Sequence, residues 1–148
     1  MNRVPGIGIA AVLLLGAAAC ASVSNSELDA EVKRLCATDG GIKVYEKVEY
    51  PREKFDRFGT IDIPPKNYAK ANDLYYYELE TQYYRRGNPE LRRDRFLINR
   101  AADHKLLGEA VSYARRGGDL PSPMHESSFR CPSDGGVSAL KKQVFWTP

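Results

Sequence analysis

The chain of 148 residues has few of the side chains that most often carry chemistry: three cysteines, two histidines, two methionines and one tryptophan. Neither His104 nor His125 lies near a second histidine or a free cysteine. A zinc site needs three or four ligands at a suitable spacing. We therefore expect no metal site, and no sequence motif points to a cofactor.

The Gly-x-Ser-x-Gly turn that presents a serine nucleophile in many hydrolases is also missing. His125 lies close to Ser127 and Ser128, but serines are ordinary residues in such proline-rich stretches. Glu78 and Glu80 would lie about 7 Å apart on one face of a strand. That separation occurs in glycosidases, and solvent-facing strands show it routinely. We expect no catalytic residues, with a small envelope hydrolase as an alternative.

No apolar run reaches the roughly 20 residues that a bilayer-spanning helix needs. The main apolar stretch covers residues 4–19, and Pro5 weakens its start as a helix. It follows Arg3 and ends in small residues, which is the layout of an export signal peptide. The formal net charge of the whole chain is only +3. Composition therefore gives no argument for a nucleic-acid partner, and we expect none.

The junction Ala17-Ala18-Ala19-Cys20 resembles the lipobox of bacterial lipoproteins, in which small residues precede a cysteine. The resemblance covers residues 1–21, although the family prefers leucine where this chain has Ala17. It implies cleavage before Cys20 and lipidation of its thiol. Ala21 rather than Asp after the cysteine implies sorting to the outer membrane, with the protein facing the periplasm. Two or three acyl chains would hold it there, because one chain binds only marginally. The alternative is an ordinary secretory peptide.

Export also determines how the remaining cysteines are interpreted. Once Cys20 carries lipid, Cys36 and Cys131 are left. In an oxidising compartment such a pair indicates a disulfide. Closing so long a loop would stabilise the fold by roughly 4 kcal/mol in the chain-entropy model. Two buried free thiols are the alternative.

The mature chain has the size of one domain, with residues 20–24 as a lipidated tether and 25–148 as a single α+β domain. Ser24 and Glu27 form a capping-box pattern that predicts a helix start. Leu28, Val32, Leu35 and Cys36 then follow at helical spacing, and glycines at 40 and 41 end the helix. A strand over 42–50 is expected next.

Three further strands are predicted over 74–86, 91–100 and 105–115, separated by turns at 87–89 and 102–104. They would form an antiparallel meander against which the first helix packs. The alternative interpretation makes 91–114 two helices, because arginine, leucine, alanine and glutamate favour helices. Residues 119–136 are predicted as a long loop that contains Cys131, and 138–146 as a last helix or strand.

Basic residues concentrate between positions 85 and 116, a stretch that contains nine basic residues and only four acidic ones. Arginine binds phosphate and carboxylate through two parallel hydrogen bonds, and the turn at Gly117-Gly118 would leave amides open to an anion. We expect the contact residues to be Arg85, Arg86, Arg92, Arg93, Arg115 and Arg116. The partner would be an envelope protein, lipopolysaccharide or peptidoglycan. The alternative is a solvated strand face.

The string from Asp39 to Glu46, and Gly108 together with Arg115–Asp119, resemble small uncharacterised lipoproteins of Gram-negative bacteria and their prophages. That resemblance implies a class of protein and no mechanism. We therefore expect a non-catalytic envelope lipoprotein that acts by contact. A superinfection-exclusion lipoprotein, which blocks an outer-membrane receptor, is a second alternative beside the hydrolase.

Overall fold

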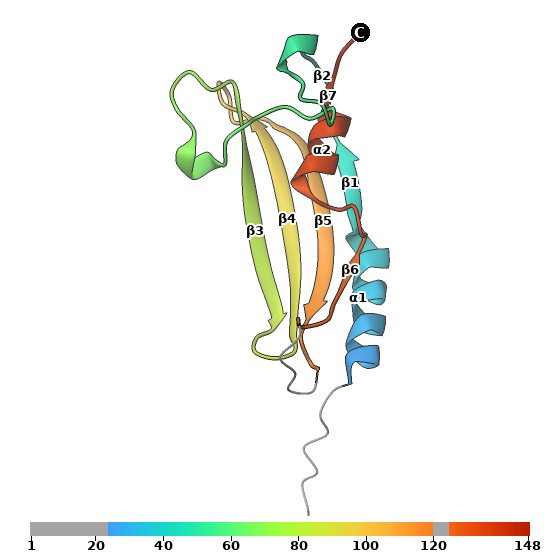
Figure 1. Ribbon diagram of the computed structural model, residues 1–148. Coiled ribbons are helices and arrows are strands. Elements are labelled where there is room, and N and C mark those ends of the chain that lie inside the picture. Colours follow the sequence, from blue (N-terminus) through green and yellow to red (C-terminus); the bar gives the residue numbers. More distant parts are fainter. Residues whose placement is uncertain (1–23, 120–124) are drawn as a thin grey trace, which may run out of the picture.

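The computed structural model describes residues 24–119 and 125–148, so the predicted signal peptide and Cys20 lie outside the described part. The fold is α+β, as the sequence predicts. Three long antiparallel strands form a meander (Figure 1): β3 (Tyr75–Arg85), β4 (Glu90–Arg100) and β5 (Leu106–Arg116). The alternative of two helices over 91–114 is therefore wrong, because β4 and β5 are strands that pair with each other along almost their whole length.

Helix α1 (Asn25–Asp39) begins where the capping box predicts. The Glu27 N–H donates to Ser24 Oγ at 3.3 Å, and the Ser24 N–H donates to the Glu27 carboxylate at 2.8 Å. These bonds satisfy amide groups that have no partner inside the helix. The apolar face of α1 then packs on β5 through Leu28, Val32 and Cys36.

Strand β5 is the central strand of its sheet. On one side it pairs with β4, which pairs in turn with β3. On the other side two short strands share its length: β1 (Gly41–Val44) pairs with 108–111 and β6 (Ser128–Cys131) pairs with 113–116. The predicted loop over 119–136 therefore contains a strand, β6, that sequence periodicity did not reveal.

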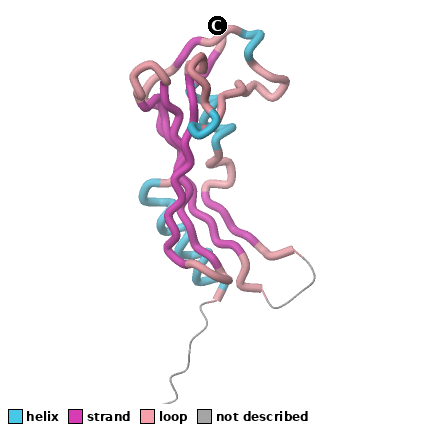
Figure 2. Tube along the Cα trace, turned by 90° about the vertical axis from the view of Figure 1, so that its left-hand side faces the viewer, coloured by secondary structure: helices cyan, strands magenta, loops and turns pink. Residues whose placement is uncertain are grey.

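The two helices cover opposite faces of the sheet, as Figure 2 shows edge-on. Successive strand residues point to opposite faces, so Val111 packs with α1 while Ala110 packs with α2 (Val137–Val144). Gly108 allows α2 to approach closely, since a Cβ atom there would lie 2.8 Å from a methyl carbon of Val144. Each helix thus encloses its own apolar cluster.

The predicted strand over 42–50 is wrong as a single element. The Tyr45 and Glu46 amides both donate to the Leu107 carbonyl, and Glu46 then pairs with Arg100 and Lys105. The chain thus bends away from β5 after β1. It continues as β2 (Val48–Glu49), which pairs in parallel with β7 (Phe145–Trp146).

The last predicted element is both helix and strand, α2 followed by β7. Two short 3-10 helices, η1 (Arg52–Lys54) and η2 (Lys66–Tyr68), lie between β2 and β3.

The predicted disulfide is confirmed: Cys36 in α1 is bonded to Cys131 at the end of β6, 95 residues later. It joins the first helix to the strand that lies beside it on the sheet edge.

Replacing both cysteines, Cys36→Ala with Cys131→Ala, should lower the free energy of unfolding by roughly 4 kcal/mol, because a loop of this length is freed in the unfolded chain. Urea unfolding of the variant, and of the native protein with and without reductant, measures the loss. Identical unfolding midpoints for the variant and the oxidised protein would contradict the prediction.

Candidate functional site

The arginines of β4 are divided between the two faces of the sheet. Arg92 pairs across the strands with Ala114, and Arg93 with Tyr113. Neighbouring strand residues point in opposite directions, so Arg93 lies on the α1 face and Arg92 on the other. The basic stretch of the sequence therefore does not form one continuous surface.

On the α1 face, Arg93 has internal partners. Its guanidinium donates to Asp39 at 2.8 Å and to the Tyr113 hydroxyl at 3.2 Å, and that hydroxyl donates to Asp39 at 2.6 Å. Burial alone would raise the pKa of Asp39, but the hydrogen bonds from Tyr113 and Arg93 outweigh it and lower that pKa. Arg93 thus ties the end of α1 to the sheet.

Arg95, two residues further along β4, is neutralised in the same way. It donates to Glu109 at 2.6 Å and to Glu80 at 3.1 Å. The Tyr45 hydroxyl donates to the other oxygen of Glu109 at 2.7 Å. Burial would raise the pKa of Glu109, but bonds from Tyr45 and Arg95 lower it overall. Glu80 is thus held by a cation, which gives no support to a free carboxylate pair with Glu78.

Arg115 is inside the protein, with only 4% of its side chain exposed. Its guanidinium donates to Asp29 at 2.6 Å, to the Gly117 carbonyl at 2.7 Å and to Ser127 Oγ at 2.8 Å. It therefore closes the end of β5 against α1 and is not presented to a partner. The Ser127 hydroxyl in turn donates to Asp119 at 2.8 Å, so its hydrogen-bonding capacity serves this structural role.

The face opposite α1 carries a pocket of about 210 Å³ beyond the end of α2. Across the strands, Ala114 on β5 has Arg92 of β4 on one side and Arg130 of β6 on the other. All three side chains lie on this face. The small Ala114 side chain leaves room between the two guanidinium groups. Three adjacent strands therefore build an arginine-lined hollow, which we call the arginine pocket.

Asp94 holds two of these arginines in place. Its carboxylate lies 3.1 Å from Arg92 and 3.7 Å from Arg130, and the residue is only 5% exposed. Thr81 donates a further hydrogen bond to Asp94, at 2.9 Å. A buried carboxylate with these partners limits the movement of both guanidinium groups.

Arg116 completes the arginine pocket and is its most accessible cation, with 66% of its side chain exposed. It pairs with Glu126 at 3.2 Å, a contact that solvent weakens. The pocket lining contains four arginines and one glutamate, but Arg115 is directed inward. Arg92, Arg116 and Arg130 thus line a hollow that is large enough for a phosphate or carboxylate group. Each of the three has a carboxylate partner, and Arg92 also pairs with Glu90 at 2.9 Å.

Arg85 and Arg86 lie at the tip of the β3–β4 hairpin, away from the pocket's floor. Arg85 Nε donates to the Pro89 carbonyl at 3.0 Å, and the Arg86 guanidinium lies 4.2 Å from the centre of the Tyr83 ring. Within the described residues, neither has a carboxylate within salt-bridge distance. The other four predicted contact residues each have a carboxylate partner: Arg92, Arg93, Arg115 and Arg116.

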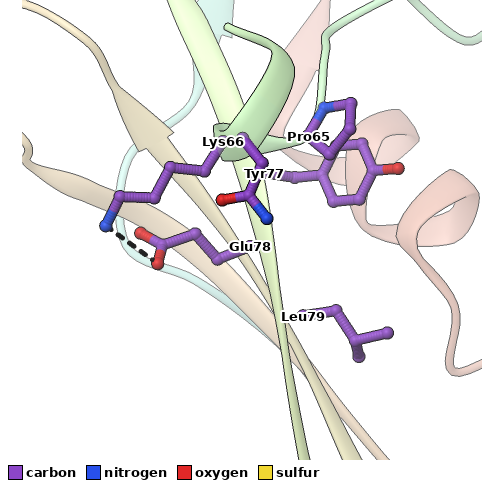
Figure 3. Close-up of a pocket in the computed structure, with 6 residues that line it drawn as sticks. Pro65, Lys66, Tyr77, Glu78 and Leu79 are labelled. Atoms are coloured by element: carbon purple, nitrogen blue, oxygen red, sulfur yellow. Dashed lines mark hydrogen bonds and ion pairs between the residues drawn. The ribbon is translucent and has the colours of Figure 1, made fainter.

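A second hollow, of about 310 Å³, lies beside the outer edge of β3 (Figure 3). Lys66 and Glu78 point toward one another across it and pair at 3.1 Å, whereas Tyr77 and Leu79 point elsewhere. The Asn99 amide also donates to Glu78. The one carboxylate that lines this hollow is thus engaged in two polar contacts.

The histidines are apart from one another. His104 lies in the β4–β5 turn with Nδ1 3.1 Å from the Tyr76 hydroxyl, and His125 is exposed. Across residues 24–119 and 125–148, no three metal-binding side chains come together. Over the same ranges no helix has the length and apolar character to cross a bilayer.

Comparison with models of known families, with curated proteins and with solved structures found no match to this chain.

Adjacent arginines allow a matched test of these assignments. Arg115→Ala should lower the free energy of unfolding by about 3 kcal/mol, because it leaves Asp29 without its partner in a partly buried setting. Arg116→Ala removes the same charge from an exposed position and should stay within about 0.5 kcal/mol. Urea unfolding measures both. Equal losses in the two variants would contradict a structural role for Arg115.

Proposed function

We propose that the protein is a non-catalytic lipoprotein of the bacterial outer membrane, anchored through Cys20 and facing the periplasm. It acts by contact, and the arginine pocket is its binding surface. The partner is an envelope component that carries phosphate or carboxylate groups, such as lipopolysaccharide or peptidoglycan, or an envelope protein with an acidic face. The lipobox-like junction of residues 17–20 and the Cys36–Cys131 bond, typical of an oxidising compartment, support the location.

The arginine pocket is the observation that carries the binding role. Arginine pairs with phosphate and carboxylate through a planar pair of donors. Arg92 and Arg130 are already held by buried Asp94, so an anion would find two guanidinium groups in place. Arg116 needs only to exchange Glu126 for the anion. Preorganisation of this kind reduces the cost of ordering side chains on binding.

The alternatives differ in what they require. A receptor-blocking lipoprotein would act by contact and is a special case of this proposal. A hydrolase built on His125 and Ser127 would need a free serine hydroxyl, but that hydroxyl accepts from Arg115 and donates to Asp119. The geometry therefore gives no support to Ser127 as a nucleophile.

The anchor is tested by replacing Cys20 with alanine. Without the thiol the chain cannot receive its lipid, so we expect Cys20→Ala to leave the membrane fraction, while the native protein stays with it. Mass spectrometry of the native N-terminal peptide should show the added acyl chains. A Cys20→Ala protein that is cut at the same site and still sediments with membranes would overturn the anchor.

The binding surface is tested by Arg116→Glu. Reversing this charge should weaken retention on lipopolysaccharide or peptidoglycan by about tenfold, equivalent to about 1.4 kcal/mol, and added salt should weaken the native protein's retention. Arg57→Glu makes the same charge change on an exposed side chain that stacks on Phe58, outside the pocket. Co-sedimentation measures both variants. If they bind equally, the arginine pocket is not the contact surface.

A further inference from the structure

Three segments far apart in sequence meet at one end of the protein (Figure 1). They are the start of α1, the β3–β4 hairpin turn and the end of β5. The Asn25 amide donates to Asp119 at 3.3 Å, and the Gly118 N–H donates to the Asn88 side chain. Gly118 also lies so close to Pro89 that a Cβ atom would come within 3.0 Å of it. The hairpin turn therefore lies beside the point where the chain enters α1.

The distance from this end to the lipid is limited by covalent geometry. Consecutive Cα atoms are 3.8 Å apart, so the chain from Cys20 to Ser24 spans about 15 Å at most. Ser24 is held in the capping box of α1 and so belongs to the folded domain. A lipid on Cys20 thus keeps this end of the domain within reach of the membrane surface.

The hairpin tip has the composition of a membrane interface contact. Tyr83 and Tyr84 are 36% and 47% exposed. Arg85 and Arg86 follow them, without a carboxylate partner in the described part of the chain. Tyrosine rings favour the headgroup level of a bilayer, and arginine binds headgroup phosphates.

The opposite end of the sheet is about 35 Å away, the length of an 11-residue strand. Trp146 lies there, because its neighbour Phe145 packs 5.0 Å from the ring of Tyr75, at the other end of β3 from Tyr83. Arg52 is at the same end, since it and Thr147 line one hollow. The protein therefore has its only tryptophan far from the hairpin tip.

We infer that the tip of the β3–β4 hairpin, residues 83–89, rests in the headgroup layer of the membrane that holds the lipid. The tyrosines enter the interface and the two arginines bind phospholipid phosphates. This second contact gives the domain a fixed orientation, which a single point of attachment cannot provide. Because the tether confines the tip near the surface, its effective concentration there is high and a weak contact suffices. The inference rests on the lipidation of Cys20 in the proposed function.

The test uses the full chain, produced in cells and reconstituted in vesicles of phosphatidylethanolamine and phosphatidylglycerol with brominated acyl chains. Bromine quenches only tryptophan that lies close to it. In the reporter protein, Tyr84→Trp combined with Trp146→Phe, the tryptophan at the tip should lose at least half of its emission. In the native protein, Trp146 should lose almost none. Vesicles of the same lipids without bromine provide the reference intensity.

A charge-reversed pair tests the arginines in the same assay. Arg85→Glu with Arg86→Glu, added to the reporter protein, should abolish most of the quenching. Arg52→Glu with Arg57→Glu, which makes the same charge change on two exposed arginines of the η1 region, should leave it unchanged. Quenching that survives in the first pair would overturn the role given to Arg85 and Arg86.

Mass spectrometry of each preparation separates this inference from the proposed function. A protein without acyl chains on Cys20 overturns the anchor, and the oriented contact with it. A lipidated protein whose tip tryptophan is not quenched overturns the tip contact alone. Equal quenching of both tryptophans overturns the orientation.

Discussion

Burial of β5 on both faces is the constraint on which the other elements depend. All nine residues from Leu107 to Arg115 are buried, so each face of this strand needs its own cover. Helix α1 covers one face and α2 the other, while β4 and the two short strands β1 and β6 satisfy its backbone. The disulfide joins the helix on one face to the strand at the edge. The sheet therefore provides a rigid support for the charged side chains around it.

The charged residues on this support are mostly structural. Arg93, Arg95 and Arg115 each have a carboxylate partner at 2.6–2.8 Å, and these partners come from α1 or from the neighbouring strand. Such pairs neutralise the basic stretch where it contacts the helix. Within the stretch 85–116, the arginines with a mostly exposed side chain or without a carboxylate partner in the described residues are Arg116 of the arginine pocket and Arg85 and Arg86 of the hairpin tip.

Pocket and tip lie close together, and this proximity links the two proposals. Arg116 and Glu126 of the arginine pocket also line a small hollow with Gly87 and Asn88 of the hairpin turn. If the tip rests on the membrane, the arginine pocket opens near the headgroup layer. Lipid-linked anions, such as the phosphates of lipopolysaccharide, would then meet the pocket at high local concentration. Soluble partners would have to approach the same narrow region beside the membrane.

Local patterns in the sequence were enough for much of the fold. The capping box at Ser24 predicted the start of α1, and the turns at 87–89 (Gly-Asn-Pro) and 102–104 (Ala-Asp-His) separated the strands of the meander. Two cysteines in a chain whose start resembles an export signal predicted the disulfide. These signals are local or compositional, so they can be interpreted without knowing what packs against them. The anchor at Cys20 stays a prediction, because it lies outside the described residues.

Only the tertiary structure decided which arginines are accessible. Arg115 and Arg116 are neighbours in sequence, yet one is buried against Asp29, 86 residues away, and the other faces solvent. Likewise, β1 and β2 are separate strands because Glu46 between them binds Arg100, 54 residues later. Strand β6 forms because β5 has an open edge with which it can pair. Ion pairs and strand pairing between distant segments leave no periodic trace in the sequence. The accessible basic surface is therefore a property of the fold, whereas the main elements, and the prediction of the compartment, follow from the sequence itself.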